Sequence, residues 1–98
     1  MAGFNIPKQI DYWRKGSREA METAELLVDN EKLLFGLFFC HLAVEKLLKA
    51  HYVRTVEKLA PKTHDLEYLA RNSGLELTGE QTDLLDFLML YQLEGRYP

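Results

Sequence analysis

Apolar residues recur every three or four positions along most of the chain, which is the period of an α-helix. The pattern predicts a first helix over about residues 7–30, because Pro7 suits a first helical turn and Asp29-Asn30 is a plausible stop. One apolar stripe runs along this helix and consists of Ile10, Trp13, Ala20, Met21, Ala24, Leu27 and Val28. No alternating run bounded by hairpin turn residues occurs, so we expect an all-α fold.

A second helix is predicted over about residues 31–59, ended by Pro61. Its first half is apolar around nearly the whole circumference, through Leu33, Leu34, Phe35, Leu37, Phe38, Phe39 and Leu42. Such a helix must be buried on more than one side, and in a small domain its own neighbours can cover only part of it. We therefore expect a homodimer, with Phe35, Phe38, Phe39 and Leu42 at the interface.

Two shorter helices complete the predicted fold. The third follows residues 62–65, where Thr63 or Asp65 can cap its start, and Asn72-Ser73-Gly74 close it. The segment Thr78-Gly79-Glu80-Gln81 has the form of a capping box and opens a fourth helix that continues to Gly95. Two long and two shorter helices with short connections predict an up-and-down antiparallel bundle of four to five helices.

Length and composition narrow the class of protein. The 98 residues make a single domain over positions 1–98, and the net charge of −3 argues against a protein that coats DNA.

The single cysteine, Cys40, lies in an apolar run, which is typical of a buried thiol in a reducing compartment. The longest apolar stretch, residues 33–40, is far shorter than the roughly 20 residues of a membrane span. We expect a cytoplasmic protein that does not contact a membrane.

Common catalytic and metal-binding signatures do not occur. His41 and His51 lie on nearly opposite sides of one helix, and there is no paired-cysteine or His-Glu-x-x-His spacing. A glycine-rich phosphate loop and a Gly-x-Ser-x-Gly elbow are also missing from the sequence. We therefore expect no metal site and no cofactor.

On the central helix, a row of polar residues allows two interpretations. His41, Glu45, Lys49 and Tyr52 fall within a sector of about 80°. They form either a solvated stripe with a weak Glu45–Lys49 pair or a functional face on which Lys46 and Lys49 bind anions. The spacing by itself favours the solvated stripe.

Two further segments are also open to two interpretations. At the start of the third helix, His64 could donate to a phosphate or act as an acid–base group, or Thr63 and Asp65 could serve only as caps with His64 packing over them. At the chain end, Arg96 could bind a phosphate and Tyr97 could stack on a base, or residues 93–98 could be an uninformative tail.

Three segments together resemble the HEPN family: residues 39–50 (FCHLAVEKLLKA), residues 61–66 (PKTHDL) and residues 95–98 (GRYP). The resemblance covers about residues 12–98 and implies an up-and-down helical bundle that dimerises. Proteins of this type are often encoded beside a minimal nucleotidyltransferase, and the two act as a toxin–antitoxin module. Many HEPN domains are metal-independent ribonucleases that carry an arginine followed, after four to six residues, by a histidine, and two subunits then build one cleft.

The chain departs from this family pattern in two respects. None of its three histidines follows an arginine at that distance, and Arg54 precedes His64 by ten residues. The sequence also stops at Pro98, where similar proteins continue into another helix, so either the chain is cut short or that helix is missing. Because the ribonuclease pair is incomplete, we expect binding rather than catalysis.

Three hypotheses follow from the sequence. The first is a homodimeric partner-binding and nucleotide-binding subunit of a prokaryotic HEPN/nucleotidyltransferase system. The second is an RNA-cleaving toxin in which His64 is the acid–base group and Arg96 stabilises charge. The third is a stand-alone nucleotide-binding regulator. The candidate residues for nucleotide or phosphate binding are Lys46, Lys49, Lys62, His64, Arg96 and Tyr97.

Overall fold

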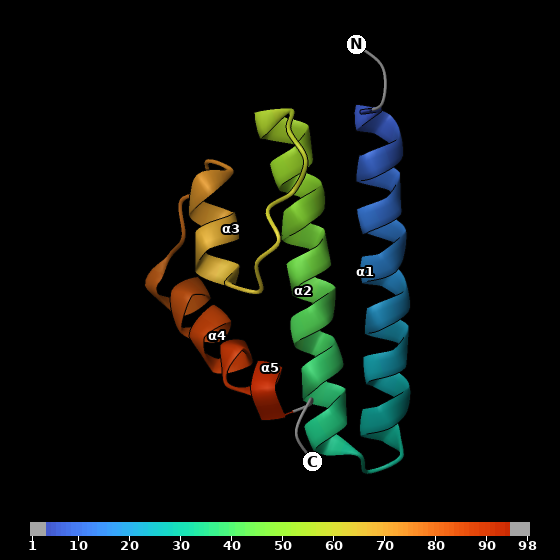
Figure 1. Cartoon of the computed structure of the whole chain (residues 1–98). Helices are drawn as coiled ribbons and strands as arrows, with labels where there is room; N and C mark the ends of the chain where they lie inside the picture. The colour runs from blue at the N-terminus through green and yellow to red at the C-terminus, as the bar shows by residue number, and fades with distance from the viewer. Residues whose placement is uncertain (1–3, 95–98) are drawn as a thin grey trace.

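The computed structural model describes residues 4–94 of the chain, with side chains up to residue 92. Its elements in chain order are α1 (Ile6–Asp29), α2 (Leu33–Val56), α3 (Leu66–Asn72), α4 (Gly79–Met89) and α5 (Tyr91–Glu94). Every regular element among the described residues is a helix (Figure 1). The predicted all-α helical fold is therefore confirmed.

Side-chain caps fix three of the helix starts. The Asn5 side chain accepts a hydrogen bond from the Lys8 N–H at 3.0 Å, and Asp65 accepts one from the Tyr68 N–H at 3.1 Å. The predicted capping box at α4 is present, because Thr78 accepts from the Gln81 N–H while the Gln81 side chain accepts from the Thr78 N–H. Polar residues at these three positions thus determine where α1, α3 and α4 begin.

Two predicted helix ends are wrong. α2 ends at Val56 rather than near Leu59, because Glu57 takes a left-handed conformation with φ of 59°, so Pro61 does not terminate it. The predicted fourth helix is interrupted at Leu90, whose N–H bonds to the carbonyl three residues earlier, and this tighter turn separates α4 from α5. Gly95, the predicted end of the fourth helix, lies outside the described residues.

α1 and α2 form a close antiparallel hairpin (Figure 1). A Cβ at Gly36 would lie 2.6 Å from Cγ2 of Val28, so only glycine allows the two helices to approach this closely here. Ser17 donates a hydrogen bond of 2.7 Å to the carbonyl of Ala43 and adds a polar link. Among the described helices, the backbone of α1 comes close to that of α2 alone.

α3, α4 and α5 pack on another side of α2. The connection 57–65 returns along α2, so that α3 points the same way as α2 (Figure 1). Leu66, Ala70, Leu85 and Leu88 form a buried cluster, against which Cys40, Val44 and Leu48 of α2 pack. The chain therefore covers much of the apolar circumference of α2 by itself.

The first turn of α2 is not covered. Leu33 is 59% exposed and Phe35 is 40% exposed, whereas Phe38, Phe39 and Leu42 are partly buried. Phe38 and Phe39 contact each other edge to face, with ring centroids 5.3 Å apart. A second subunit over Phe35, Phe38, Phe39 and Leu42 stays a prediction, and Phe35 is the member with most surface left to bury.

Candidate functional site

A row of buried polar side chains runs along α2. His41, Glu45 and Lys49 are spaced four residues apart and are each less than a tenth exposed. The interpretation of this row as a solvated stripe is wrong, because connection 57–65 lies along α2 and Trp13 of α1 lies beside Lys49. The helical period places these residues on one face, but it does not show what covers that face.

Glu45 is the centre of the row. Its Oε2 lies 3.1 Å from Nζ of Lys49, and its Oε1 lies 2.9 Å from Nδ1 of His64. Because a carboxylate only accepts hydrogen bonds, Nδ1 of His64 is the donor in this contact. The His64 side chain is 55% exposed, so its Nε2 is free to act toward solvent while the carboxylate fixes the ring. This is the arrangement in which an imidazole serves as an acid–base group.

His41 also contacts His64, through the backbone carbonyl of His64. Nε2 of His41 lies 3.2 Å from the carbonyl oxygen of His64 and donates to it, because a carbonyl can only accept. Burial lowers the pKa of His41, against the opposing influence of this hydrogen bond and of Glu45. The neutral form of His41 is therefore favoured at neutral pH, where its 3.9 Å approach to Glu45 is not an ion pair.

These two contacts anchor His64 from one turn of α2. His41 binds its backbone and Glu45 binds its ring, immediately before the cap of α3. A cavity of about 290 Å³ adjoins the ring, lined by Phe38, His41, Leu42, Glu45, His64 and Gln92. Oε1 of Gln92 is buried and has no hydrogen-bond partner among the described residues. The arrangement offers a small, mostly apolar cavity beside the imidazole that Glu45 fixes.

Trp13 closes the other end of the row. Nζ of Lys49 lies 5.1 Å from the centroid of its ring and Nζ of Lys46 lies 5.4 Å from it, both within reach of a cation–π contact. Lys49 is thus engaged by both Glu45 and Trp13, and a phosphate would have to compete with Glu45 for it. The sequence assigned Trp13 only to the apolar stripe of α1, and its place beside the lysines was missed.

The remaining predicted site residues are only partly brought together. Lys62 is exposed and lies two residues before His64. Asp65 caps α3, and Thr63 accepts a hydrogen bond from the Asp65 N–H. The simpler interpretation of this segment is wrong for His64, because its ring bonds to Glu45 instead of packing over the caps. Arg96 and Tyr97 lie outside the described residues, so the pairing of His64 with Arg96 stays a prediction. Phosphate binding by Lys46, Lys49 and Lys62 likewise stays a prediction.

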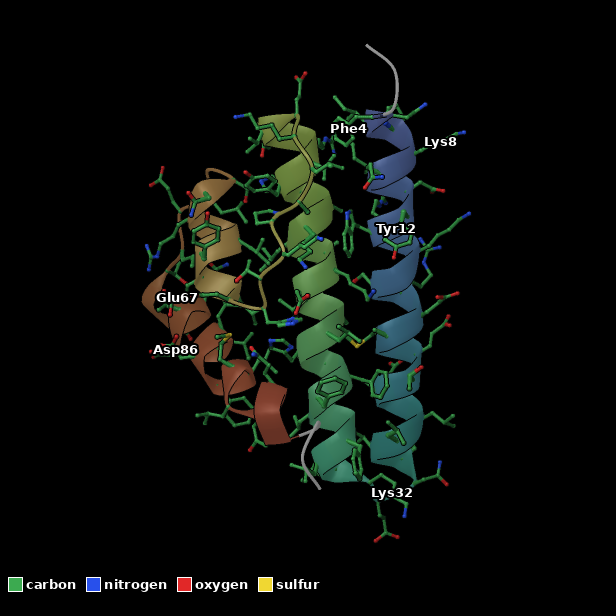
Figure 2. The ribbon with its side chains drawn as sticks, viewed as in Figure 1. Phe4, Lys8, Tyr12, Lys32, Glu67 and Asp86 are labelled. Carbon is green, nitrogen blue, oxygen red and sulfur yellow. The ribbon has the colours of Figure 1, made fainter. Side chains whose placement is uncertain are left out.

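A second titratable pair joins α3 to α4 on the outer side of the molecule. Figure 2 shows Glu67 and Asp86 next to each other there, away from α1. A shared hydrogen bond with Glu67 raises the pKa of Asp86. Asp86 is exposed, whereas the Glu67 side chain is 29% exposed. Arg71 lies 3.2 Å from Glu67 and compensates part of this charge. This pair therefore serves as a surface contact between α3 and α4.

Within residues 4–94, no group of three or more histidine, cysteine or acidic side chains is placed to hold a metal ion. None of the described helices combines the length and the hydropathy that a crossing of the bilayer requires.

Comparison with known proteins places the chain in a family. No curated protein and no solved structure matches it. A family model described as the HEPN domain matches residues 10–98, which is nearly the whole chain. The match includes Glu45 and the three side chains around it, which together we call the Glu45 cluster: His41, Glu45, Lys49 and His64. On this match and on its all-α fold, the chain belongs to the HEPN domain family.

Proposed function

We propose that the chain is a homodimeric binding subunit of a prokaryotic HEPN/nucleotidyltransferase pair of the toxin–antitoxin kind. The observation that carries the proposal is the uncovered start of α2, where Leu33, Leu34 and Phe35 follow one another on the surface. Leu26 and Val28 at the end of α1 are also exposed, at the same end of the helical hairpin. Exposed apolar residues grouped in this way are typical of surfaces that bind another protein.

Self-association is the first part to test. We expect wild-type protein to run as a dimer in size-exclusion chromatography with light scattering, and Phe35→Glu to run as a monomer, because the change buries an unpaired carboxylate at the interface. Leu59→Glu is the matched control, since Leu59 is 61% exposed and follows the opposite end of α2. A monomeric wild type, or a dimeric Phe35→Glu variant, would contradict the proposed interface.

The partner is the second part. A tagged chain drawn from its native host should retain a nucleotidyltransferase in stoichiometric amount, as identified by mass spectrometry. Recovery of the chain alone would contradict the two-component proposal and leave a stand-alone dimer.

Nucleotide binding is the third part. Lys46 and Lys62 are the candidate phosphate ligands that the Glu45 cluster does not already engage, and Arg96 and Tyr97 are proposed to complete the site. Calorimetric titration with ATP, GTP and AMP should give saturable binding that weakens in Lys62→Gln. Flat isotherms with all three nucleotides would remove nucleotide binding from the proposal.

A second candidate function is cleavage of RNA, and the 2.9 Å contact between Glu45 and His64 favours it. Nε2 of His64 would accept the proton of the attacking ribose hydroxyl, and Glu45 would stabilise the resulting imidazolium. His64→Ala should abolish cleavage of a host RNA, while His51→Ala, on the same helix as Glu45 but outside the cluster, should retain it. Cleavage that persists in His64→Ala would exclude this mechanism.

A further inference from the structure

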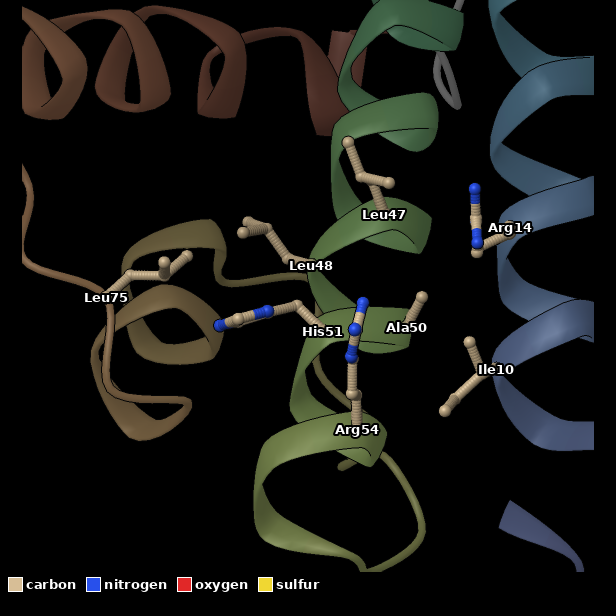
Figure 3. Close-up of a pocket in the computed structure, with 8 residues that line it drawn as sticks. All are labelled: Ile10, Arg14, Leu47, Leu48, Ala50, His51, Arg54 and Leu75. Carbon is tan, nitrogen blue, oxygen red and sulfur yellow. The ribbon is translucent and has the colours of Figure 1, made fainter. Parts of the chain in front are cut away.

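A second recess lies on the molecule apart from the Glu45 cluster. It has a volume of about 400 Å³ and is lined by Ile10, Arg14, Leu47, Leu48, Ala50, His51, Arg54 and Leu75. Figure 3 shows Ile10 and Arg14 approaching it from α1 and Arg54 from α2. Leu47 lies about 200° around α2 from Glu45, so the recess opens on the opposite side of the helix from the buried row. We call it the arginine recess.

Two arginines give the arginine recess its charge. Arg14 and Arg54 also line an adjoining hollow of about 380 Å³, together with Pro7, Ile10 and Asp11. Neither arginine forms an ion pair with any described residue. Asp11, the carboxylate that lines the adjoining hollow, is paired with Lys15 at 3.3 Å. Two guanidinium groups without a counter-ion among the described residues therefore line one space in a protein of net charge −3.

The rest of the lining is apolar. Five of the eight lining residues are Ile10, Leu47, Leu48, Ala50 and Leu75. Leu47 is 55% exposed, so apolar surface remains uncovered directly beside the two charges. A recess of this volume, with mostly apolar walls and a few polar groups, has the character of a small-molecule site.

The polar groups present indicate which ligand suits the recess. Arginine binds phosphate or carboxylate oxygens through two parallel hydrogen bonds, and two arginines on different helices can hold one anion between them. Besides the two arginines, His51 is the one polar residue in the lining, which has no side-chain amide, hydroxyl or carboxylate to read the edges of a nucleobase. The walls therefore favour an apolar body over a nucleoside.

We propose that the arginine recess binds a small organic phosphate with an apolar or aromatic body. The phosphate lies between Arg14 and Arg54, and the body packs on Leu47 and Leu48. This site is distinct from the nucleotide site proposed around Lys62 and does not depend on it.

The test uses 1-naphthyl phosphate as the probe, followed by amide chemical shifts in NMR titrations of the full chain. We expect saturable binding with shifts in α1 and α2 around the recess, and weaker binding of inorganic phosphate and of 1-naphthol, because each supplies only half of the contacts. Arg14→Gln and Arg54→Gln should each lower the affinity for the probe by roughly tenfold or more, because each variant loses a charge-assisted hydrogen bond. Arg54→Lys should fall between, because it keeps the charge without the planar fork.

Arg18→Gln is the matched control, since Arg18 is an exposed arginine one turn after Arg14 that does not line the recess. It should bind the probe like the wild type. The proposal would be overturned if the wild type showed no saturable binding, or if the Arg14→Gln and Arg54→Gln variants bound the probe as tightly as the wild type. Tighter binding of AMP than of the probe, lost in Arg54→Gln but kept in Lys62→Gln, would also overturn it, because it would make the recess a nucleotide site.

Discussion

The Glu45–Lys49 pair allows a quantitative test of the buried row. The two side chains are 4% and 8% exposed, and their charged atoms are 3.1 Å apart. With an effective dielectric constant of about 20, their Coulomb attraction is about 5 kcal/mol, and most of it offsets the loss of hydration. Removing one partner leaves the other buried and uncompensated, so Glu45→Gln should lower the free energy of unfolding by about 3–5 kcal/mol.

This loss is a large fraction of the total stability of a typical domain, which is about 5–15 kcal/mol. Lys49→Met alone should also be costly, because it leaves Glu45 with only His64 as a partner. Glu45→Gln combined with Lys49→Met should cost clearly less than the sum of the single changes, since neither charge then remains buried alone. Urea unfolding would be followed by far-UV circular dichroism and by the fluorescence of Trp13, the only tryptophan, whose ring lies against Lys49.

An exposed pair supplies the control. Lys15 and Asp11 are 3.3 Å apart but more than half exposed, and Lys15→Met should change the stability little. The reasoning would be refuted if Glu45→Gln behaved like Lys15→Met, or if the costs of Glu45→Gln and Lys49→Met were simply additive.

Three further predictions concern single residues. Burial lowers the pKa of His41, so as the pH falls the unfolded chain takes up a proton there before the folded chain does. The stability of the folded protein should therefore fall as the pH drops below the ordinary histidine pKa of 6.5. Urea titrations of His41→Gln should show a smaller fall. An unchanged pH profile in that variant would contradict the assignment. Gly36→Ala should cost about 1–3 kcal/mol because its methyl group overlaps α1, whereas Gly79→Ala, which meets nothing within 4 Å, should not destabilise the protein in the same assay. Burial and then the charge of Glu25 raise the pKa of Cys40, so iodoacetamide should alkylate this thiol slowly at neutral pH, as followed by mass spectrometry, and Glu25→Gln should accelerate the reaction. Equal rates in both proteins would exclude the influence of Glu25.

The sequence predicted the features of the fold that depend on local chemistry. The helical period located all the longer helices, and the polar caps at Asp65 and Thr78 were readable because the capping residue and its target lie within three positions. The end of α2 at Glu57 was not readable, because a left-handed residue other than glycine carries no clear compositional signal. The break at Leu90 was missed for a similar reason, since no proline or glycine lies beside it and Leu88, Met89 and Gln92 are good helix formers.

The candidate site shows the same division. His64 was singled out from its position at a helix start, and Glu45 and Lys49 from their shared face. That His64 bonds to Glu45 depends on the path of connection 57–65, which no periodicity describes. A joint site of Arg14 and Arg54 was missed, because they lie forty residues apart and line one recess only through the packing of α1 on α2.

The position of α1 has a consequence for how the protein opens. Because the backbone of α1 approaches only α2 among the described helices, α1 can separate from α2 without disturbing the packing of α3, α4 and α5 on α2. The amide hydrogens of α1 should therefore exchange through a partial opening, while those of α2 and α3 exchange only when the whole chain unfolds. A molecule bound between Arg14 and Arg54 would hold α1 against α2 and make this partial opening rarer. Occupancy of the arginine recess would therefore set how often α1 separates from α2.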